Sequence, residues 1–128
     1  MEPLIFIVDD DPFFSRIVSS ILKKYQFSNI RLFESGEECM NNISCLPKLV
    51  FLDYDMKGMN GIDVLIKIRE QYPTITVVMV SAQEKIDVAL SAIKMGAYDY
   101  LIKDNQLLPK IEKTIDELKS ITLNPILN

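Results

Sequence analysis

The sequence predicts a doubly wound α/β domain, because five short apolar segments alternate with five segments of helical periodicity. Three of the apolar segments are nearly continuous and rich in Val, Ile and Phe, which is typical of strands covered on both faces. The chain has 128 residues, enough for one domain with one core. Strands that alternate with helices predict a mainly parallel sheet with right-handed crossovers.

The strands are expected in the five apolar segments. Periodicity alone does not separate a buried strand from a buried helix, so this assignment depends on the short length and β-branched content of the segments. The expected strands are Leu4–Val8, Asn29–Phe33, Lys48–Leu52, Thr74–Val80 and Tyr98–Ile102. Five such strands favour a flavodoxin-like parallel sheet of order 2-1-3-4-5.

The helices are expected where apolar residues recur at helical spacing. Asp11 followed by Pro12 is typical of a helix start, with a capping acceptor and then a ring at the first helical position. Ser35 with Glu38 resembles a capping box for the short second helix. Gly96 is the expected C-terminal stop of the fourth. The apolar positions of the first, third, fourth and fifth helices are Phe14, Ile17, Val18, Ile21, Leu22 and Tyr25; Ile62, Leu65 and Ile66; Ile86, Ala89, Leu90 and Ile93; and Leu107, Leu108, Ile111, Ile115 and Leu118.

Composition excludes several function classes. The formal net charge of −4 argues against a nucleic-acid-binding domain and gives no attraction to an anionic membrane. Without histidine, the chain has no Ser-His-Asp triad, His-ligated zinc site or phosphohistidine carrier. The first apolar run is too short for a signal peptide or a membrane span. We therefore expect a soluble, cytoplasmic protein with reduced thiols at Cys39 and Cys45, a domain of residues 1–120 and a short C-terminal tail of residues 121–128.

Polar side chains follow four of the predicted strands. Asp9 and Asp10 end the first strand, Asp53 the third, Ser81 the fourth and Lys103 the fifth. Taken singly, each has an ordinary structural explanation as a helix cap, a turn residue or a solvated charge. Together they are expected at one edge of the sheet, where doubly wound folds bind ligands beyond the carboxyl ends of the strands.

The charges of this group limit what it can do. Two like charges 4 Å apart at an effective dielectric constant near 20 repel by about 4 kcal/mol, which a bound divalent cation would relieve. Oxygen ligands favour Mg²⁺, Mn²⁺ or Ca²⁺, and few protein ligands favour Mg²⁺. Lys103 and Ser81 could hold a phosphoryl group. No His, Cys or obvious base stands at these strand ends, which leaves a carboxylate as the nucleophile and an aspartyl phosphate as the product.

Residues 3 to 119 resemble the receiver domains of response regulators in two-component signal transduction. Four motifs in order carry the resemblance, each after a predicted strand. They are IFIVDDDP (Ile5–Pro12), LVFLDYDMKGMNG (Leu49–Gly61), VVMVSA (Val77–Ala82) and MGAYDYLIKD (Met95–Asp104).

The resemblance implies a role for each charged residue at the strand ends. Asp53 would be the phosphoacceptor, and Asp10 would ligate Mg²⁺ directly, for which Mn²⁺ could substitute. Asp9 would support the metal through water. The backbone carbonyl of Asp55 would be another ligand, with its side chain pointing elsewhere. Lys103 would pair with the phosphoryl group.

The resemblance also implies a switch and its partners. Phosphorylation would draw the Ser81 hydroxyl inward, and Tyr100 would follow. The surface of the fourth helix, fifth strand and fifth helix would then change. A sensor histidine kinase or phosphotransfer protein would supply the phosphoryl group, and a downstream protein or a covalently attached effector domain would read the surface. The chain would act as a monomer or a weak phosphorylation-dependent dimer, without direct nucleic-acid or membrane binding.

Two positions depart from the family pattern, and two other functions stay open. Lys57 and Asp104 stand where the family usually or often has proline, and Asp104 could instead cap the fifth helix.

The resemblance implies a protein that catalyses only its own phosphorylation and dephosphorylation. The alternatives are a degenerate receiver that only binds proteins, and a phosphatase of the haloacid-dehalogenase type, whose Asp-x-Asp motif the Asp53-Tyr54-Asp55 segment resembles.

Overall fold

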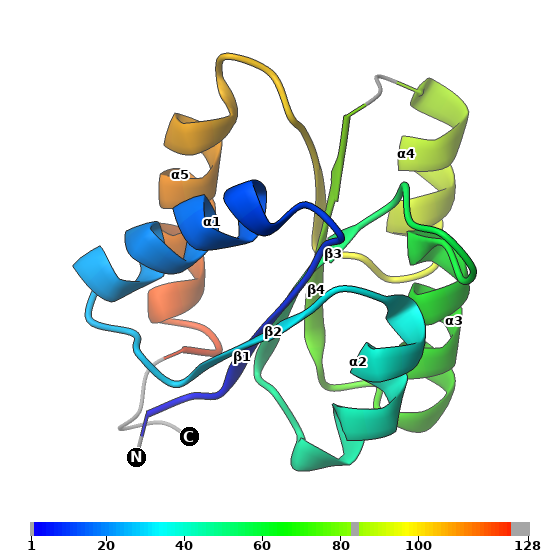
Figure 1. The fold of residues 1–128 in the computed structure, drawn as a ribbon, viewed down its shortest axis with the longest axis horizontal. Helices are drawn as coiled ribbons and strands as arrows, with labels where there is room; N and C mark the ends of the chain where they lie inside the picture. The colour runs from blue at the N-terminus through cyan, green and yellow to red at the C-terminus, as the bar shows by residue number, and fades with distance from the viewer. Residues whose placement is uncertain (1, 83–84, 124–128) are drawn as a thin grey trace.

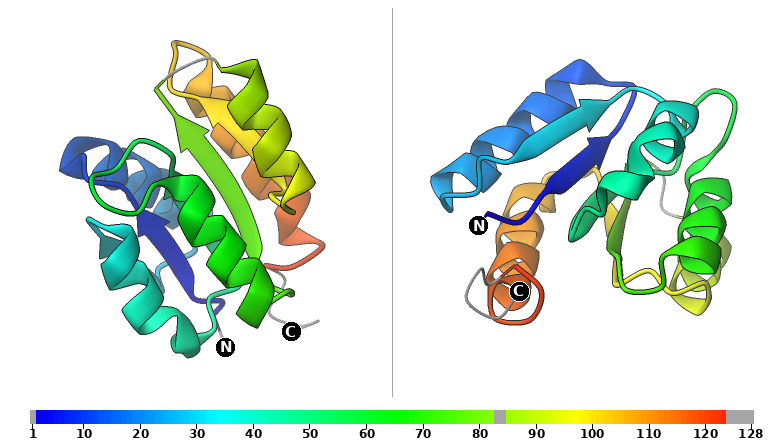
Figure 2. Two further views of the ribbon diagram at one scale, coloured as in Figure 1. Left: turned by 90° about the vertical axis from the view of Figure 1, so that its right-hand side faces the viewer. Right: turned by 90° about the horizontal axis from the view of Figure 1, so that it is seen from below.

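The computed structural model describes residues 2–82 and 85–123. Five parallel strands form one sheet in the order β2-β1-β3-β4-β5, which confirms the predicted topology. The strands are β1 (Ile5–Val8), β2 (Ile30–Phe33), β3 (Leu49–Asp53), β4 (Thr76–Ser81) and β5 (Asp99–Ile102). The arrows in Figure 2 point the same way, so the carboxyl ends of the strands share one edge.

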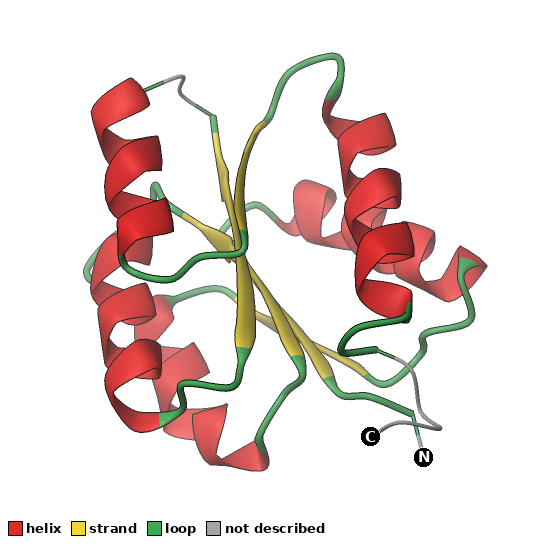
Figure 3. Cartoon of the chain, turned by 180° about the vertical axis from the view of Figure 1, so that it is seen from behind, coloured by secondary structure: helices red, strands yellow, loops and turns green. Residues whose placement is uncertain are grey.

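Helices cover both faces of the sheet (Figures 1 and 3). One face packs against α1 and α5, and the other against α2, α3 and α4. The helices are α1 (Pro12–Lys24), α2 (Gly36–Asn42), α3 (Gly61–Gln71), α4 (Ile86–Lys94) and α5 (Leu107–Lys119), and a short 3-10 turn, Ile43–Cys45, follows α2. In the described residues, no helix is long and apolar enough to span a membrane.

Alternate residues of the strands fill two separate cores. Ile5 and Ile7 of β1 point to the α1–α5 side, whereas Phe6 and Val8 point to the other side. All four are fully buried, as expected for a strand in the middle of a parallel sheet. Because both faces of these strands are apolar, the strands appear in the sequence as continuous runs of apolar residues.

The ends of β3 and β4 extend further than predicted. Asp53 pairs with Val80, and Ser81 pairs with Ile102, inside the parallel ladder. These two polar residues are therefore held by the sheet itself and not by a loop after it. Strand geometry fixes the direction of their side chains more tightly than a loop would.

The helix starts largely follow their expected capping residues. The Ser35 hydroxyl accepts a hydrogen bond from the backbone N–H of Glu38 at the start of α2. A reciprocal capping box, which was not predicted from the sequence, joins Asn60 and Asp63 at the start of α3. Gly96 follows the end of α4 with φ +97°, the left-handed conformation expected at such a stop.

The chain after α5 returns to the core. Leu123 is fully buried on the α1–α5 side, and its backbone N–H donates to the carbonyl of Leu118. The first residues of the predicted tail thus pack against the domain. Its remaining residues, 124–128, lie outside the described residues.

Replacing Asp11 with Ala should lower the free energy of unfolding by about 1 kcal/mol, because the α1 start would lose its cap. The exposed Asp11 carboxylate accepts the backbone N–H of Phe13 at 3.0 Å. Urea unfolding measures the loss. The metal affinity should stay unchanged, since Asp11 is not part of the carboxylate cluster described below. A loss of metal affinity equal to that of an Asp10→Ala control would contradict this assignment.

Candidate functional site

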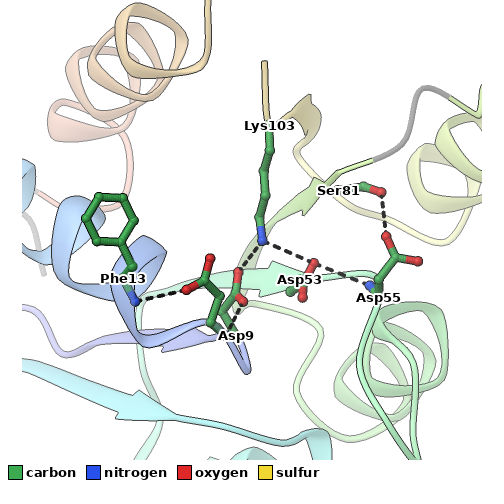
Figure 4. A network of polar contacts seen from close by, with 7 residues as sticks. Asp9, Phe13, Asp53, Asp55, Ser81 and Lys103 are labelled. Atoms are coloured by element: carbon green, nitrogen blue, oxygen red, sulfur yellow. Dashed lines mark hydrogen bonds and ion pairs between the residues drawn. The ribbon is translucent and has the colours of Figure 1, made fainter. Parts of the chain in front are cut away.

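The polar residues predicted at the strand ends do meet at one edge of the sheet (Figure 4). Asp9 directly follows β1, and Lys103 directly follows β5. Asp53 and Ser81 are the last residues of β3 and β4. Topology brings them together, because β1, β3, β4 and β5 are consecutive neighbours in the sheet.

Three carboxylates form a cluster that could hold a cation. One carboxylate oxygen from each of Asp9, Asp10 and Asp53 lies within 4.8 Å of the other two. Asp9 and Asp53 are 1 % and 4 % exposed, whereas Asp10 is exposed. This all-oxygen donor set, partly shielded from water, fits a hard divalent cation.

The negative charge of the Asp53 carboxylate is poorly compensated by the groups around it. Burial, followed by the negative charge of Asp9, raises the pKa of Asp53 from 3.8 to about 7. Lys103 and the backbone N–H of Asp55 act in the opposite direction, but they do not outweigh these effects. A carboxylate in this state gains from added positive charge, which supports the fit of the carboxylate cluster to a cation.

Lys103 reaches into the cluster and is held there on two sides. Its Nζ lies 2.7 Å from Oδ2 of Asp9 and 3.7 Å from Oδ1 of Asp53. The same atom lies 4.3 Å from the centroid of the Phe14 ring, a cation–π distance. Helical spacing predicts Phe14 as a core residue and does not predict this contact. The ammonium group is thus kept beside the carboxylates, closer to Asp9 than to Asp53.

Asp55 bridges the phosphoacceptor candidate and the switch candidate. Its backbone N–H donates to Oδ1 of Asp53 at 3.3 Å, and its carboxylate accepts the Ser81 hydroxyl, also at 3.3 Å. Tyr100 is half-buried in β5. Burial raises the pKa of Tyr100, although a side-chain hydrogen bond with Ser81 opposes this effect. The contact between the Asp55 carboxylate and Ser81 was not predicted from the sequence.

The loop after Asp55 is fixed from a neighbouring helix. The Glu37 carboxylate at the start of α2 accepts the backbone N–H of Met59 at 3.3 Å. Gly58 has φ +76° in this loop, a conformation that favours glycine.

The predicted cap at Asp104 is wrong: its carboxylate accepts the N–H of Gln106, and α5 begins at Leu107 without a side-chain cap.

The fold and the site define a receiver domain. The chain belongs to the response regulator receiver domain family, which matches residues 5–115. It is 33 % identical over 121 residues to the nitrogen assimilation regulatory protein NtrX of Azorhizobium caulinodans, covering 90 % of this chain and 26 % of that protein. It is 32 % identical to the transcriptional regulatory protein ZraR of Escherichia coli, covering 91 % of this chain and 27 % of that protein.

Solved structures agree with this assignment. The receiver domain of NtrX from Brucella abortus superimposes with a TM-score of 0.81 at 29 % identity, covering 91 % of this chain and 98 % of that one. The protein is therefore a receiver domain of a two-component response regulator, similar to those of NtrX and NtrC. It spans about a quarter of the length of the curated relatives described above.

Proposed function

We propose that Asp53 accepts a phosphoryl group from a phosphohistidine on a sensor histidine kinase or a phosphotransfer protein. A carboxylate oxygen of Asp53 would attack phosphorus, the P–N bond would break, and the imidazole would leave and take up a proton. The observation that carries this proposal is the convergence of Asp9, Asp10 and Asp53 around the ammonium group of Lys103.

Each neighbour of Asp53 has a proposed task. Asp10, Asp53 and the backbone carbonyl of Asp55 would hold Mg²⁺, or Mn²⁺ in its place, and Asp9 would support the metal through water. The metal supplies positive charge that offsets the charge on the phosphoryl oxygens. Lys103, held 3.7 Å from Asp53, would pair with the phosphoryl group on its other side.

The remaining proposal concerns the output. Ser81 would turn its hydroxyl to the phosphoryl group, and Tyr100 would follow, which changes the surface of α4, β5 and α5. This surface exposes apolar side chains of α4, including Ile86, Leu90 and Ile93, which supports a role in protein contacts. A downstream protein or a covalently attached effector domain would read it.

The proposal extends to the setting of the domain. Residues 1–120 would form the receiver unit, working in the cytoplasm as a monomer or a weak phosphorylation-dependent dimer. The formal charge of −4 supports the absence of direct nucleic-acid or membrane contacts. The domain would catalyse only its own phosphorylation and the hydrolysis of its acyl phosphate.

Incubation with acetyl phosphate and Mg²⁺ tests the central step. The intact mass should rise by one phosphoryl group, and the gain should require the metal. Asp53→Asn should show no gain, since an amide cannot form the acyl phosphate. A wild-type protein that stays unmodified, or a gain that survives in Asp53→Asn, would refute the proposal. Turnover of a generic phosphomonoester would instead favour the phosphatase alternative.

A further inference from the structure

The Ser81 hydroxyl donates to a side chain other than that of Asp53. Ser81 is 1 % exposed at the end of β4, and its Oγ donates to Oδ2 of Asp55 at 3.3 Å (Figure 4). Asp55 lies in the loop two residues after Asp53, with its carboxylate turned toward β4. This hydrogen bond joins the loop beside the phosphoacceptor to the strand that carries the switch hydroxyl.

This contact competes with the one that phosphorylation requires. A serine hydroxyl has a single proton, so it cannot donate to Asp55 and to a phosphoryl oxygen on Asp53 at once. An ionised acceptor also holds a donor more strongly than a neutral one. The described ion pairs of Lys103 are with Asp9 and Asp53, so this cation does not neutralise Asp55.

The contact extends to Tyr100. The side chains of Tyr100 and Ser81 share a hydrogen bond. Ser81 therefore contacts both Asp55 and Tyr100, and moving its hydroxyl toward Asp53 would disturb both contacts.

We propose that Asp55 is a positioning residue: its carboxylate holds the Ser81 hydroxyl, and through it Tyr100, in an arrangement that must be given up before Ser81 can donate to a phosphoryl group on Asp53. Breaking this hydrogen bond costs free energy. Asp55 thereby lowers the net free energy that the phosphoryl group supplies for switching the domain. This inference rests on the proposed function of Asp53. It assigns the carboxylate of Asp55 a role separate from that of its backbone carbonyl at the metal.

Beryllofluoride binding with Mg²⁺ tests the proposal, with Asp55→Ala as the main variant. The side chain of Asp55 is exposed, so its removal should leave the fold intact. We expect Asp55→Ala to bind beryllofluoride about threefold to tenfold more tightly, the equivalent of one lost hydrogen bond. Asp55→Asn is the matched control. It loses the charge but keeps an acceptor oxygen, so its gain should be clearly smaller.

A Ser81→Ala background separates this competition from simple charge repulsion. The gain from Asp55→Ala should fall below about twofold there, because no hydroxyl remains to be released. Repulsion between Asp55 and the bound anion would persist in both backgrounds. Equal gains in the two backgrounds, or equal gains for Ala and Asn, would overturn the proposal.

A second measurement needs no phosphoryl analogue. NMR three-bond couplings should show one dominant χ1 rotamer for Ser81 in the wild-type protein, and a mixture in Asp55→Ala. An unchanged rotamer distribution would overturn the proposal even if beryllofluoride binds. Failure of the wild-type protein to bind beryllofluoride would instead count against Asp53 as the phosphoacceptor, while the rotamer result would still decide the role of Asp55.

Discussion

Replacing Asp53 with Asn is expected to raise the free energy of unfolding by about 4 kcal/mol at pH 8 in the absence of divalent metal. Burial and the charge of Asp9 raise the pKa of this carboxyl from 3.8 to about 7 in the folded protein. At pH 8 the wild-type domain therefore carries an ionised carboxylate in an unfavourable place. The amide of Asn fills the same volume and can still accept the N–H of Asp55.

The pH dependence follows from the sign of this shift. Below pH 3.8 the carboxyl is protonated in both states, and Asp53 costs nothing. Between pH 3.8 and about 7 the folded state holds a proton that the unfolded state has lost, so raising the pH removes stability. Above pH 7 the loss is complete. The advantage of Asp53→Asn should thus shrink to about 1 kcal/mol at pH 4.5.

Urea unfolding at pH 4.5 and pH 8 with a chelator provides the measurement. Saturating Mg²⁺ at pH 8 should restore much of the wild-type stability by binding the folded state. The variant should gain less, because it keeps only Asp9 and Asp10 of the three carboxylates. If the free energy of unfolding changed equally with pH in the two proteins, the charge of Asp53 would not be destabilised by its neighbours.

The sheet and the meeting of the site residues could be predicted because they depend on strong, simple signals. Buried parallel strands need continuous apolar runs, and parallel order sends the carboxyl ends of strands to one edge. Those two facts alone predict that the polar residues at the strand ends lie close together, namely Asp9, Asp53, Ser81 and Lys103. The strand bounds are predicted less closely, since the predicted strand begins at Thr74, whereas β4 begins at Thr76.

The contacts among site residues depend on side-chain direction, which sequence pattern does not encode. Helical spacing marks Phe14 as a core residue, but it does not indicate that the ammonium of Lys103 lies over its ring. The bond from Ser81 to Asp55 depends on the path of one loop and one rotamer. The capping box at Asn60 and Asp63 was detectable, because a capping residue stands three positions before an acid.

Replacing Gly61 with Ala should lower the free energy of unfolding by about 3 kcal/mol and impair phosphorylation as well. A Cβ atom at Gly61 would lie 2.6 Å from the backbone oxygen of Asp53 and 2.8 Å from Cα of Tyr54. Both atoms belong to the main chain, which cannot give way as a side chain can. The backbone N–H of Gly61 also donates to the Tyr54 carbonyl at 3.0 Å, which holds the two segments together.

Gly36→Ala is a matched control for this substitution. Gly36 also begins a helix, and its added Cβ would also meet an atom at 2.6 Å, but that atom is a methyl group of Val64. Because the nearest atom at Gly36 belongs to a side chain and not to the main chain of Asp53 or Tyr54, Gly36→Ala should cost less stability and leave the rate of phosphorylation by acetyl phosphate near that of the wild type. Gly61→Ala should slow that reaction, because relieving its clash moves the backbone of Asp53. Equal effects of the two substitutions on stability and rate would mean that the close approach of α3 to β3 does not position the reacting carboxylate.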